Sequence, residues 1–447
     1  MESFDVVVIG GSTAGAPTAM LLARRGHKVL LIDKREFPRD TLSTHFIWAR
    51  GVSYLNRWGL AKTVLDQTPG FRDLQLNVEG ICLNGSVPLR DLEDRFQELH
   101  GNAEGVTDIC CGPRRYLLDQ ILLNAAKDAG VEVREGVTFT HPIMKADAVV
   151  GIHAVSQKGP EIHAKAKVVI AADGRFSRFA RMIGAKTRVR RELSTFAYWG
   201  YFQGAKNVTQ AIHKRGRLGT AVFPTSDGTH MALAYGPRAW WDDFRRDPEE
   251  NYFKLFDFCS AEVGAALRAA KRDQPFKACG SMPAFQREIV GPGWVLIGDA
   301  GGFHDQVTAM GQTHAFRDAE LVAQFIQKGL SGEMTLAQAL TAYERARAAD
   351  YDAYFEFSCR MAEMNAYSTP EIGYFYSIRT DQSQVNQLIS QLGDTLPFTQ
   401  GTQFSGAPDA GLPAVLGAFE SRLGGYGYNI FQSDVAEHQA DRLAEAV

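Results

Sequence analysis

The fold is decided by Phe4-Asp-Val-Val-Val-Ile-Gly-Gly-Ser-Thr-Ala-Gly15, an apolar β-branched run that stops at three glycines. A second apolar run ends at Asp33, 23 residues after Gly10. This strand–turn–helix–strand pattern predicts a dinucleotide site, in which a tight turn at Gly10 leads into a helix whose first amides face a pyrophosphate. Asp33 is placed to accept hydrogen bonds from a ribose diol.

One position departs from the pattern G-x-G-x-x-G, because Ser12 stands where the second glycine is expected. Serine is small enough to permit the approach of a phosphate. Gly15 leaves no Cβ between the helix and the sheet. A buried βαβ unit without a ligand is the alternative interpretation.

The composition describes an ordinary globular protein. The chain has 447 residues, of which 45% are hydrophobic and 22% charged, so two or three structural regions are expected. Its formal net charge of −3 provides no electrostatic basis for binding nucleic acid or an anionic membrane. It contains no uncharged apolar run long enough for a membrane span.

The six cysteines include no C-x-x-C pair and no metal-type spacing with histidine, so we expect no metal site. Reduced thiols in a cytoplasmic protein are the corresponding expectation. The apolar N-terminal segment contains Arg24 and Arg25 and lacks a cleavage site, which favours a strand and helix over a signal peptide.

Further elements follow from the periodicity. An amphipathic helix is expected over 113–130 and a buried strand over 167–171, whereas aromatic-rich antiparallel strands are expected between 196 and 235. A parallel-type strand at 294–297 precedes two helices, over about 313–328 and 337–364, and a final polar helix near the C-terminus.

Three motifs follow the dinucleotide turn in order: Arg115-x-x-Leu-Asp119 on a helix, Asp173-Gly174 after a strand and Gly298-Asp299 after a later strand. With this set the chain resembles the FAD-dependent aromatic hydroxylases, the class A flavoprotein monooxygenase (p-hydroxybenzoate hydroxylase-like) superfamily, over about residues 4–330.

The resemblance implies an α/β fold in which a Rossmann-type FAD-binding domain is interleaved with a mostly antiparallel β-sheet substrate domain. The FAD-binding domain would comprise residues 1–72, 109–185 and 286–330. The substrate domain would comprise 73–108 and 186–285, and a C-terminal helical region and tail would occupy 331–447.

The resemblance also assigns roles to residues. Asp299 would accept a hydrogen bond from the flavin ribitol, Asp173 would shape the pyrophosphate side, and Arg50 and Arg115 would face phosphate oxygens. Residues 136–137 would lie beside the adenine, and a helix opening at 311–313 would face the pyrimidine edge of the isoalloxazine. The complete expected cofactor-binding set is Gly10, Gly11, Thr13, Ala14, Gly15, Asp33, Lys34, Arg50, Arg115, Val137, Asp173, Asp299, Gly311, Gln312 and Thr313.

The implied activity is hydroxylation of an aromatic or polycyclic small molecule by molecular oxygen through a flavin C4a-hydroperoxide. No second dinucleotide motif follows a strand, so NAD(P)H would visit transiently, or a partner reductase would supply the electrons. His304 and His45 are candidate bases because each lies in a loop expected next to the flavin, and Asp305 is placed to orient His304. Loop or capping roles are the alternative for all three.

The loop after Gly298-Asp-Ala departs from the hydroxylases, which have two prolines followed by Gly-x-x-Gly-x-Asn. Asp305 and Gln306 stand at the prolines, Thr308 at the first glycine and Thr313 at the asparagine. These differences do not change the expectation of bound FAD, but they leave open that the protein is an oxygen-independent FAD-dependent reductase or dehydrogenase.

Two related branches, and a non-catalytic flavin-binding protein, are further alternatives. Flavin-dependent halogenases carry a Trp-x-Trp-x-Ile-Pro motif that this sequence lacks. Geranylgeranyl-reductase-like flavoproteins carry K-x-C-G-E where this chain has residues 40–45.

Overall fold

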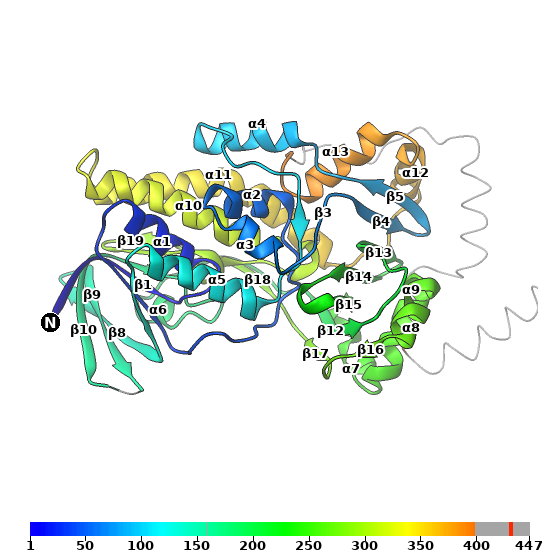
Figure 1. Ribbon diagram of the computed structural model, residues 1–447, viewed down its shortest axis with the longest axis horizontal. Helices are drawn as coiled ribbons and strands as arrows, with labels where there is room; N and C mark the ends of the chain where they lie inside the picture. The colour runs from blue at the N-terminus through cyan, green and yellow to red at the C-terminus, as the bar shows by residue number, and fades with distance from the viewer. Residues whose placement is uncertain (158, 398–428, 432–447) are drawn as a thin grey trace, which may run out of the picture. The chain divides into compact units, whose positions relative to one another are not determined.

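The computed structural model describes residues 1–157, 159–397 and 429–431. It divides into two compact units, each built from several segments of the chain (Figure 1). Unit 1 comprises Met1–Gly70, Leu92–Glu192 and Pro283–Glu356, and unit 2 comprises Phe71–Asp91, Leu193–Met282 and Phe357–Val447. Within the described ranges, no helix combines the length and apolar character needed to cross a membrane.

The main sheet of unit 1 grows from the N-terminal apolar run. Val7 of the first strand pairs with Val169 on one side and Leu30 on the other, both in parallel. These central strands are apolar at almost every position because both faces of a parallel sheet are buried. The strand order is β19-β20-β10-β1-β2-β7, with β9 pairing β10 and β8 pairing β9. The bounds are β1 Glu2–Ile9, β2 Val29–Asp33, β7 Glu132–Glu135, β8 Val137–Lys145, β9 Ala148–Ser156, β10 Glu161–Ala171, β19 Val290–Gly291 and β20 Trp294–Leu296.

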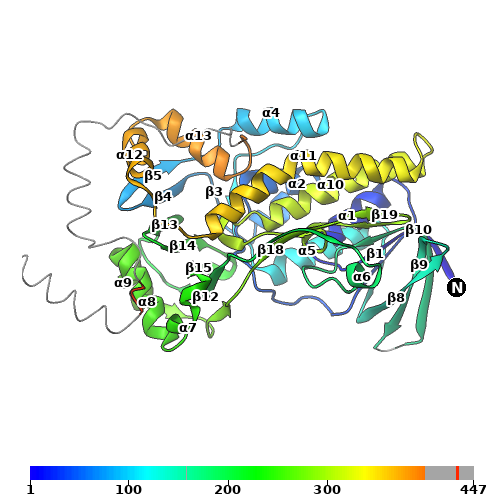
Figure 2. The same cartoon turned by 180° about the vertical axis from the view of Figure 1, so that it is seen from behind.

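The helices of unit 1 bury their apolar faces in the same core as this sheet. Leu22, Leu122 and Val322, from three different helices, are fully buried there. Figures 1 and 2 both show α10 and α11 running side by side. The helices are α1 Gly15–Arg24, α2 Ala49–Arg57, α3 Ala61–Leu65, α4 Leu89–His100, α5 Arg115–Asp128, α6 Arg178–Met182, α10 Gly311–Leu330 and α11 Leu336–Ala362; the last turn of α11 and the start of α4 belong to unit 2.

Short elements complete unit 1 beside the parallel sheet. Strands β11, β18 and β21 form an antiparallel sheet in that order. The short 3₁₀ helices η3 and η4 flank β21 and precede α10. Their bounds are β11 Thr187–Arg191, β18 Ala284–Arg287, η3 Gly298–Ala300, β21 Gly302–Phe303 and η4 Gln306–Thr308. Strand β6 Cys110–Cys111 also belongs to unit 1, whereas β3 Gly70–Phe71 has one residue in each unit.

Unit 2 is built on a mostly antiparallel sheet with the order β16-β12-β15-β14-β13-β4-β5, with β17 also pairing β12. Several of its aromatic side chains pack into a shared core, in which Phe196 and Tyr198 contact Phe244. Its strands are β4 Leu74–Val78, β5 Ile81–Gly85, β12 Thr195–Gln203, β13 Ala211–Arg215, β14 Leu218–Pro224, β15 Thr229–Pro237, β16 Lys271–Arg272 and β17 Lys277–Cys279. Its helices are η1 Ser226–Gly228, η2 Arg238–Trp240, α7 Trp241–Phe244, α8 Pro248–Cys259, α9 Ala261–Ala269, α12 Thr369–Ile378 and α13 Gln382–Leu392.

The predicted fold class is confirmed: a Rossmann-type parallel sheet, an antiparallel sheet and C-terminal helices are all present. The helix expected over 113–130 is α5, and those expected near 313–328 and 337–364 are α10 and α11. The final polar helix lies outside the described residues. The roles of FAD-binding and substrate-binding domains stay predictions.

Candidate functional site

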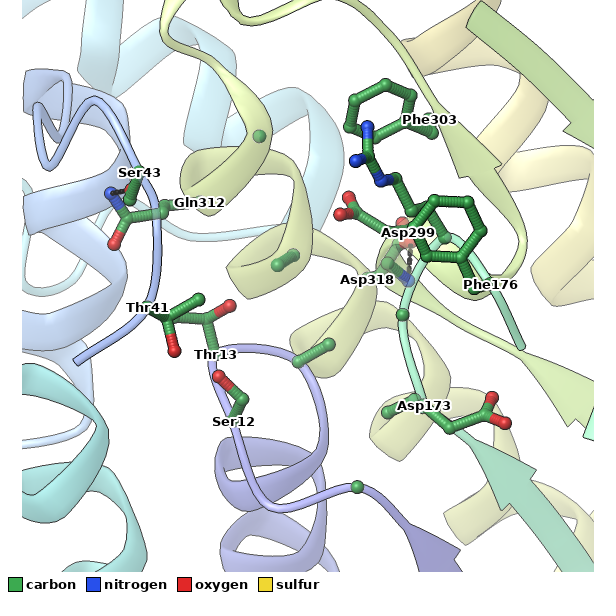
Figure 3. A pocket seen from close by; sticks show the side chains of 18 of the residues that line it. Ser12, Thr13, Thr41, Ser43, Asp173, Phe176, Asp299, Phe303, Gln312 and Asp318 are labelled. Atoms are coloured by element: carbon green, nitrogen blue, oxygen red, sulfur yellow. Dashed lines mark hydrogen bonds between the residues drawn. The ribbon is translucent and has the colours of Figure 1, made fainter. Parts of the chain in front are cut away.

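A cavity of about 640 Å³ lies within unit 1, in the size range of ligand pockets. Its wall is formed by the turn between β1 and α1, the end of β2, the residues after β10, and the segment from η3 to the start of α10. Figure 3 shows Ser12 and Thr13 on one side and Asp299 and Phe303 on another. This edge lies at the carboxyl ends of parallel strands, where open α/β sheets bind ligands.

The first turn is shaped by two glycines that admit no side chain. Gly10 has φ +103°, and a Cβ there would lie 2.4 Å from the carbonyl oxygen of Ala172. A Cβ on Gly15 would lie 1.8 Å from the carbonyl oxygen of Gly10. The chain can therefore bring the start of α1 against the strand ends only with glycine at both positions. Gly15 and Gly11 shape the turn but do not line the cavity, whereas Gly10, Thr13 and Ala14 do.

Asp33 ties the end of β2 to the glycine turn. Its Oδ2 accepts a hydrogen bond from the Gly11 N–H at 2.8 Å, and its Oδ1 accepts one from the Arg35 N–H at 2.9 Å. The Arg39 guanidinium adds an ion pair at 3.3 Å. Asp33 and its neighbour Lys34 both line the cavity. Oδ2 thus has two donors, whereas Oδ1 has one and keeps a second lone pair for a ligand hydroxyl.

The serine that replaces the second glycine has a bonding role. Its hydroxyl donates to Asp119 Oδ2 at 2.9 Å and accepts from Arg115 Nη2 at 2.5 Å. Arg115 also forms two 3.0 Å bonds with Asp119, one turn along α5. Ser12 therefore connects the glycine turn to a guanidinium that lines the cavity. This connection lay beyond the sequence, which suggested only that serine is small enough.

Asp173 and Asp299 both line the cavity, as does Val137. Asp173 Oδ2 accepts from the Arg178 and Phe179 amides, so this residue holds the start of α6. Asp299 is exposed toward the cavity, yet its surroundings raise its pKa to about 6, chiefly by removing solvent, against the opposing effect of Arg115 and Arg175. A carboxylate in such surroundings gains from hydrogen-bond donors supplied by a ligand.

The start of α10 forms the opposite wall. Gly311 and Gln312 line the cavity, and Gln312 Nε2 lies 3.5 Å from Ser43 Oγ (Figure 3). Gln312 Oε1 is buried without a hydrogen-bond partner among the described residues. The side chain of Thr313 does not line the cavity; a Cβ on Gly51 of α2 would lie 2.6 Å from Thr313 Oγ1. The contact predicted for Thr313 therefore lacks support from its side chain, because that side chain faces α2.

The three catalytic candidates separate in the structure. His304 and Asp305 are buried and line the cavity, but His45 is completely buried, with φ +61°, and does not line it. The structure does not support a ligand contact for His45, because its neighbours Ser43 and Thr44 line the wall whereas His45 itself is buried away from it. Asp305 Oδ1 accepts from the Val307 N–H at 3.0 Å and thereby caps η4.

His304 is a weak base in this position. Burial lowers its pKa to about 4, against the raising effect of a bond to the Asp305 carbonyl. Its Nε2 lies 3.1 Å from His314 Nδ1, and its Nδ1 lies 3.1 Å from the Asp305 carbonyl oxygen. His314 also lines the cavity. His304 is therefore half of an imidazole pair rather than an isolated base.

Arg50 belongs to a buried ion network instead of the cavity wall. Its side chain is fully buried, and Nη2 donates to both oxygens of Asp350, at 2.7 and 2.9 Å. Arg317 bridges Asp350 (2.6 Å) and Asp318 (2.9 Å), and Arg347 pairs with Asp318 at 3.2 Å. The structure does not support the phosphate contact predicted for Arg50, because its guanidinium is bound to a partner 300 residues away in the sequence.

This ion network also fixes one segment of the cavity wall. Asp318 Oδ2 accepts the Gly298 N–H at 2.9 Å and so holds the turn that presents Asp299 (Figure 3). Burial opposes ionisation of Asp318, but Arg347 and Arg317 outweigh it and lower its pKa.

Sequence reasoning missed His314, Arg347 and Tyr351, which all line the cavity. His314 could have been found, since it lies three positions after Gly311 on the same helix face as Asp318. Arg347 and Tyr351 come from α11, and only the packing of α11 beside α10 brings them to the site.

Comparison with known proteins is consistent with this geometry. The family model described as "FAD binding domain" matches residues 3–358. The chain is 24% identical over 358 residues to a tryptophan 2-halogenase of Chondromyces crocatus, covering 77% of this chain and 65% of the relative, and thus less than two thirds of that protein. It is 25% identical over 362 residues to a digeranylgeranylglycerophospholipid reductase of Methanocella arvoryzae, covering 77% of this chain and 82% of the relative.

Solved structures share the fold. The flavin-dependent brominase Bmp2 superposes with a TM-score of 0.72 at 19% identity, covering 94% of this chain and 99% of Bmp2. PqsL of Pseudomonas aeruginosa, described as "a probable FAD-dependent monooxygenase", superposes with a TM-score of 0.65 at 16% identity, covering 88% of this chain and 100% of PqsL. The resemblance to the class A flavoprotein monooxygenase superfamily is thereby confirmed.

Proposed function

This chain belongs to the FAD-binding domain family and is an FAD-dependent oxidoreductase, and we propose that it is an NAD(P)H-using monooxygenase that hydroxylates an aromatic or polycyclic small molecule. Bound FAD would supply hydride acceptance and oxygen activation. The observation that carries the proposal is the polar but deeply buried end of the cavity at His304 and His314, where both imidazoles are kept neutral. Oxygen transfer needs a site that excludes water more than it needs strong acids or bases.

The cavity residues fit FAD. The glycine turn admits no side chain at Gly10, which leaves its backbone open to a pyrophosphate. Asp33 has acceptor capacity for a ribose, and Asp299 faces the cavity in surroundings that favour donors such as ribitol hydroxyls. Buried polar atoms of Gln312 and Gln306 have no partner among the described residues and line the same wall, so they call for a polar ligand.

In this proposal the protein's residues bind and orient rather than transfer protons. Arg115, held by Asp119 and Ser12, would meet a phosphate with a preorganised guanidinium. The start of α10 at Gly311 and Gln312 would place a helix N-terminus against the electron-accepting ring, where negative charge develops on reduction. NAD(P)H would approach transiently, and dioxygen would be the second substrate.

A second candidate is an oxygen-independent reductase, or a halogenase, of the related branches. The observation that favours it is the similarity to the reductase of Methanocella arvoryzae and the halogenase of Chondromyces crocatus. The departures from the hydroxylase loop motif at Gln306 and Thr308 also favour this second candidate.

The test follows NAD(P)H oxidation and dioxygen uptake by the FAD-loaded protein across a panel of phenols and polycyclic aromatics, with heavy-isotope dioxygen and product mass spectrometry. We expect one substrate to stimulate both signals and to gain one heavy oxygen atom. Equal NAD(P)H oxidation without dioxygen, with saturation of a prenyl probe, would contradict hydroxylation. A brominated product formed only in bromide buffer would contradict it in favour of halogenation.

A further inference from the structure

The segment that precedes α10 carries a side-chain amide without a bonding partner. Gln306 is the first residue of η4, lines the cavity and belongs to unit 1. The residue as a whole is half-buried, but its Nε2 and Oε1 are both buried, and neither atom has a hydrogen-bond partner. Within residues 1–157, 159–397 and 429–431, it is the only side-chain amide whose buried donor and buried acceptor both lack partners.

This state is unfavourable for an amide. A donor or acceptor that is buried without a partner loses the hydrogen bonds that it makes with water in the unfolded chain. Other half-buried glutamines of unit 1 have partners: Gln327 Oε1 lies 2.6 Å from His27 Nε2, and Gln286 Nε2 donates to Asp352 at 3.2 Å. Buried polar groups of native proteins are nearly always bonded, to the protein itself, to water or to a ligand. The Gln306 amide therefore calls for a partner.

The backbone around Gln306 is held in place. Its carbonyl oxygen accepts from the Ala309 N–H at 2.8 Å, and the Thr308 carbonyl oxygen accepts from Trp48 Nε1 at 3.0 Å. The start of η4 is also capped by Asp305. The side chain is therefore the part of this residue that can adjust. Since Gln306 borders the cavity, rotation about its own side-chain bonds brings the amide to a ligand without a change in η4.

A second amide on the same wall has an unused acceptor. Gln312, in the first turn of α10, is 6% exposed and lines the cavity. Its Nε2 lies 3.5 Å from Ser43 Oγ, which is a long hydrogen bond, and its Oε1 is buried without a partner (Figure 3). The segment from η4 to the start of α10 thus contains one amide nitrogen and two amide oxygens that no described residue uses.

We propose that Gln306 turns its amide into the cavity and forms two hydrogen bonds with an amide-type edge of a ligand, in which an N–H lies beside a C=O. Gln306 Nε2 donates to the ligand carbonyl, and Oε1 accepts from the ligand N–H. Gln312 Oε1 is a second acceptor for a group of the same kind. A proline at position 306, as in the hydroxylase motif, could form neither bond. The inference deepens the proposed function and rests on its FAD-containing cavity, but not on oxygen transfer.

Two sources present such an edge: the isoalloxazine ring of FAD, in which N3–H lies between two carbonyl groups, and an aromatic substrate that carries a carboxamide. In the first arm of the test, the apoprotein is titrated with FAD and with N3-methyl-FAD, which lacks that N–H. In the second arm, the FAD-loaded protein is titrated with 2-naphthamide and with N,N-dimethyl-2-naphthamide. Both arms compare the wild type, Gln306→Met and Gln327→Met. Gln327 is the matched control, because it is a half-buried glutamine that does not line the cavity.

A hydrogen bond contributes about threefold to tenfold to affinity. The wild type and Gln327→Met should prefer the N–H-bearing ligand of at least one arm over its methylated analogue, and in Gln306→Met this preference should fall about threefold to tenfold. A fall in the first arm identifies the flavin as the ligand, and a fall in the second identifies a carboxamide substrate. The proposal is overturned if Gln306→Met keeps the wild-type flavin preference and the naphthamide arm shows either no binding or an unchanged preference. An equal fall in Gln327→Met would also overturn it.

NMR of the wild-type protein tests the same bonds without relying on the affinity of a variant. With glutamine labelled at its side-chain nitrogen, the signals of Gln306 are assigned by their absence in Gln306→Met. One of its two Nε2–H protons should move to lower field, as a hydrogen-bonded amide proton does, when FAD or 2-naphthamide is added. Signals that stay in place with both ligands would contradict the turn of the amide. A failure to oxygenate any substrate would contradict only the proposed function.

Discussion

Replacing Asp350 by asparagine should destabilise unit 1 far more than its small change in shape suggests. Asp350 is completely buried and accepts from Arg50, from Arg317 at 2.6 Å and from Arg95. Burial opposes its ionisation, but Arg50 and Arg317 hold its pKa well below the usual range. Asparagine keeps the volume but removes the charge that balances these guanidiniums.

The size of this destabilisation follows from the guanidinium charges that remain when the charge of Asp350 is removed. Removing one partner of a buried ion pair costs about 3–5 kcal/mol, because the other charge is left without compensation. Here two fully buried guanidiniums, those of Arg50 and Arg317, lose their shared partner at once. We therefore expect the free energy of unfolding to fall by about 3–5 kcal/mol.

The assay is urea unfolding of the FAD-loaded protein, with the release of flavin fluorescence reporting on unit 1 and equal free FAD in all samples, because bound ligand adds stability. The control is Asp352→Asn, two positions along the same helix, whose exposed carboxylate accepts one bond from Gln286. That variant should differ from the wild type by less than about 0.5 kcal/mol. A loss below about 1 kcal/mol in Asp350→Asn would refute the idea that the network bears this unit's stability.

Three further predictions concern the cavity. Asp33→Ala should weaken FAD binding about tenfold to a hundredfold, since it removes a buried acceptor that also holds the Gly11 amide; fluorescence titration of the apoprotein would measure this, and unchanged affinity would contradict the ribose role. Ser12→Ala should weaken FAD binding about threefold to tenfold by releasing Arg115, whereas Ser3→Ala, on the exposed start of β1, should have no effect. FAD affinity should rise as the pH passes through about 6, the pKa of Asp299, and should level off about one unit higher, where Asp299 is a carboxylate; Asp299→Asn should abolish this slope, and a persisting slope would implicate another group.

We expect acid to destabilise the folded protein by protonating the aspartates of the buried ion network. Asp318 and Asp350 have lowered native pKa values, so their stabilisation is complete above the ordinary aspartate value of about 3.9 and is lost as the pH falls through the native values. The stabilisation from these two carboxylates should therefore be constant above about pH 5, and its loss should lower the unfolding midpoint steeply below about pH 4. In Asp350→Asn this drop should be shallower, and an identical profile would contradict the assignment.

The sequence by itself determined the features that depend on short stretches of chain. The run from Phe4 to Gly15 with Asp33 specifies a strand, a tight turn and a helix start, because each step depends on local backbone freedom and side-chain size. These local constraints predicted ligand contacts for Gly10 and Asp33, whereas Asp173 and Asp299 were predicted from the family resemblance; all four line the cavity.

Tertiary structure alone decided which of the remaining polar residues face the ligand. His45 lies in the loop before α2, and Arg50 lies in the first turn of this helix. Arg50 nevertheless pairs with Asp350, and His45 is completely buried. Conversely, Tyr351 reaches the cavity only because α11 packs beside α10. Which side chains of a helix face the cavity depends on packing against elements that can lie hundreds of residues away. The local sequence does not specify the positions of those elements.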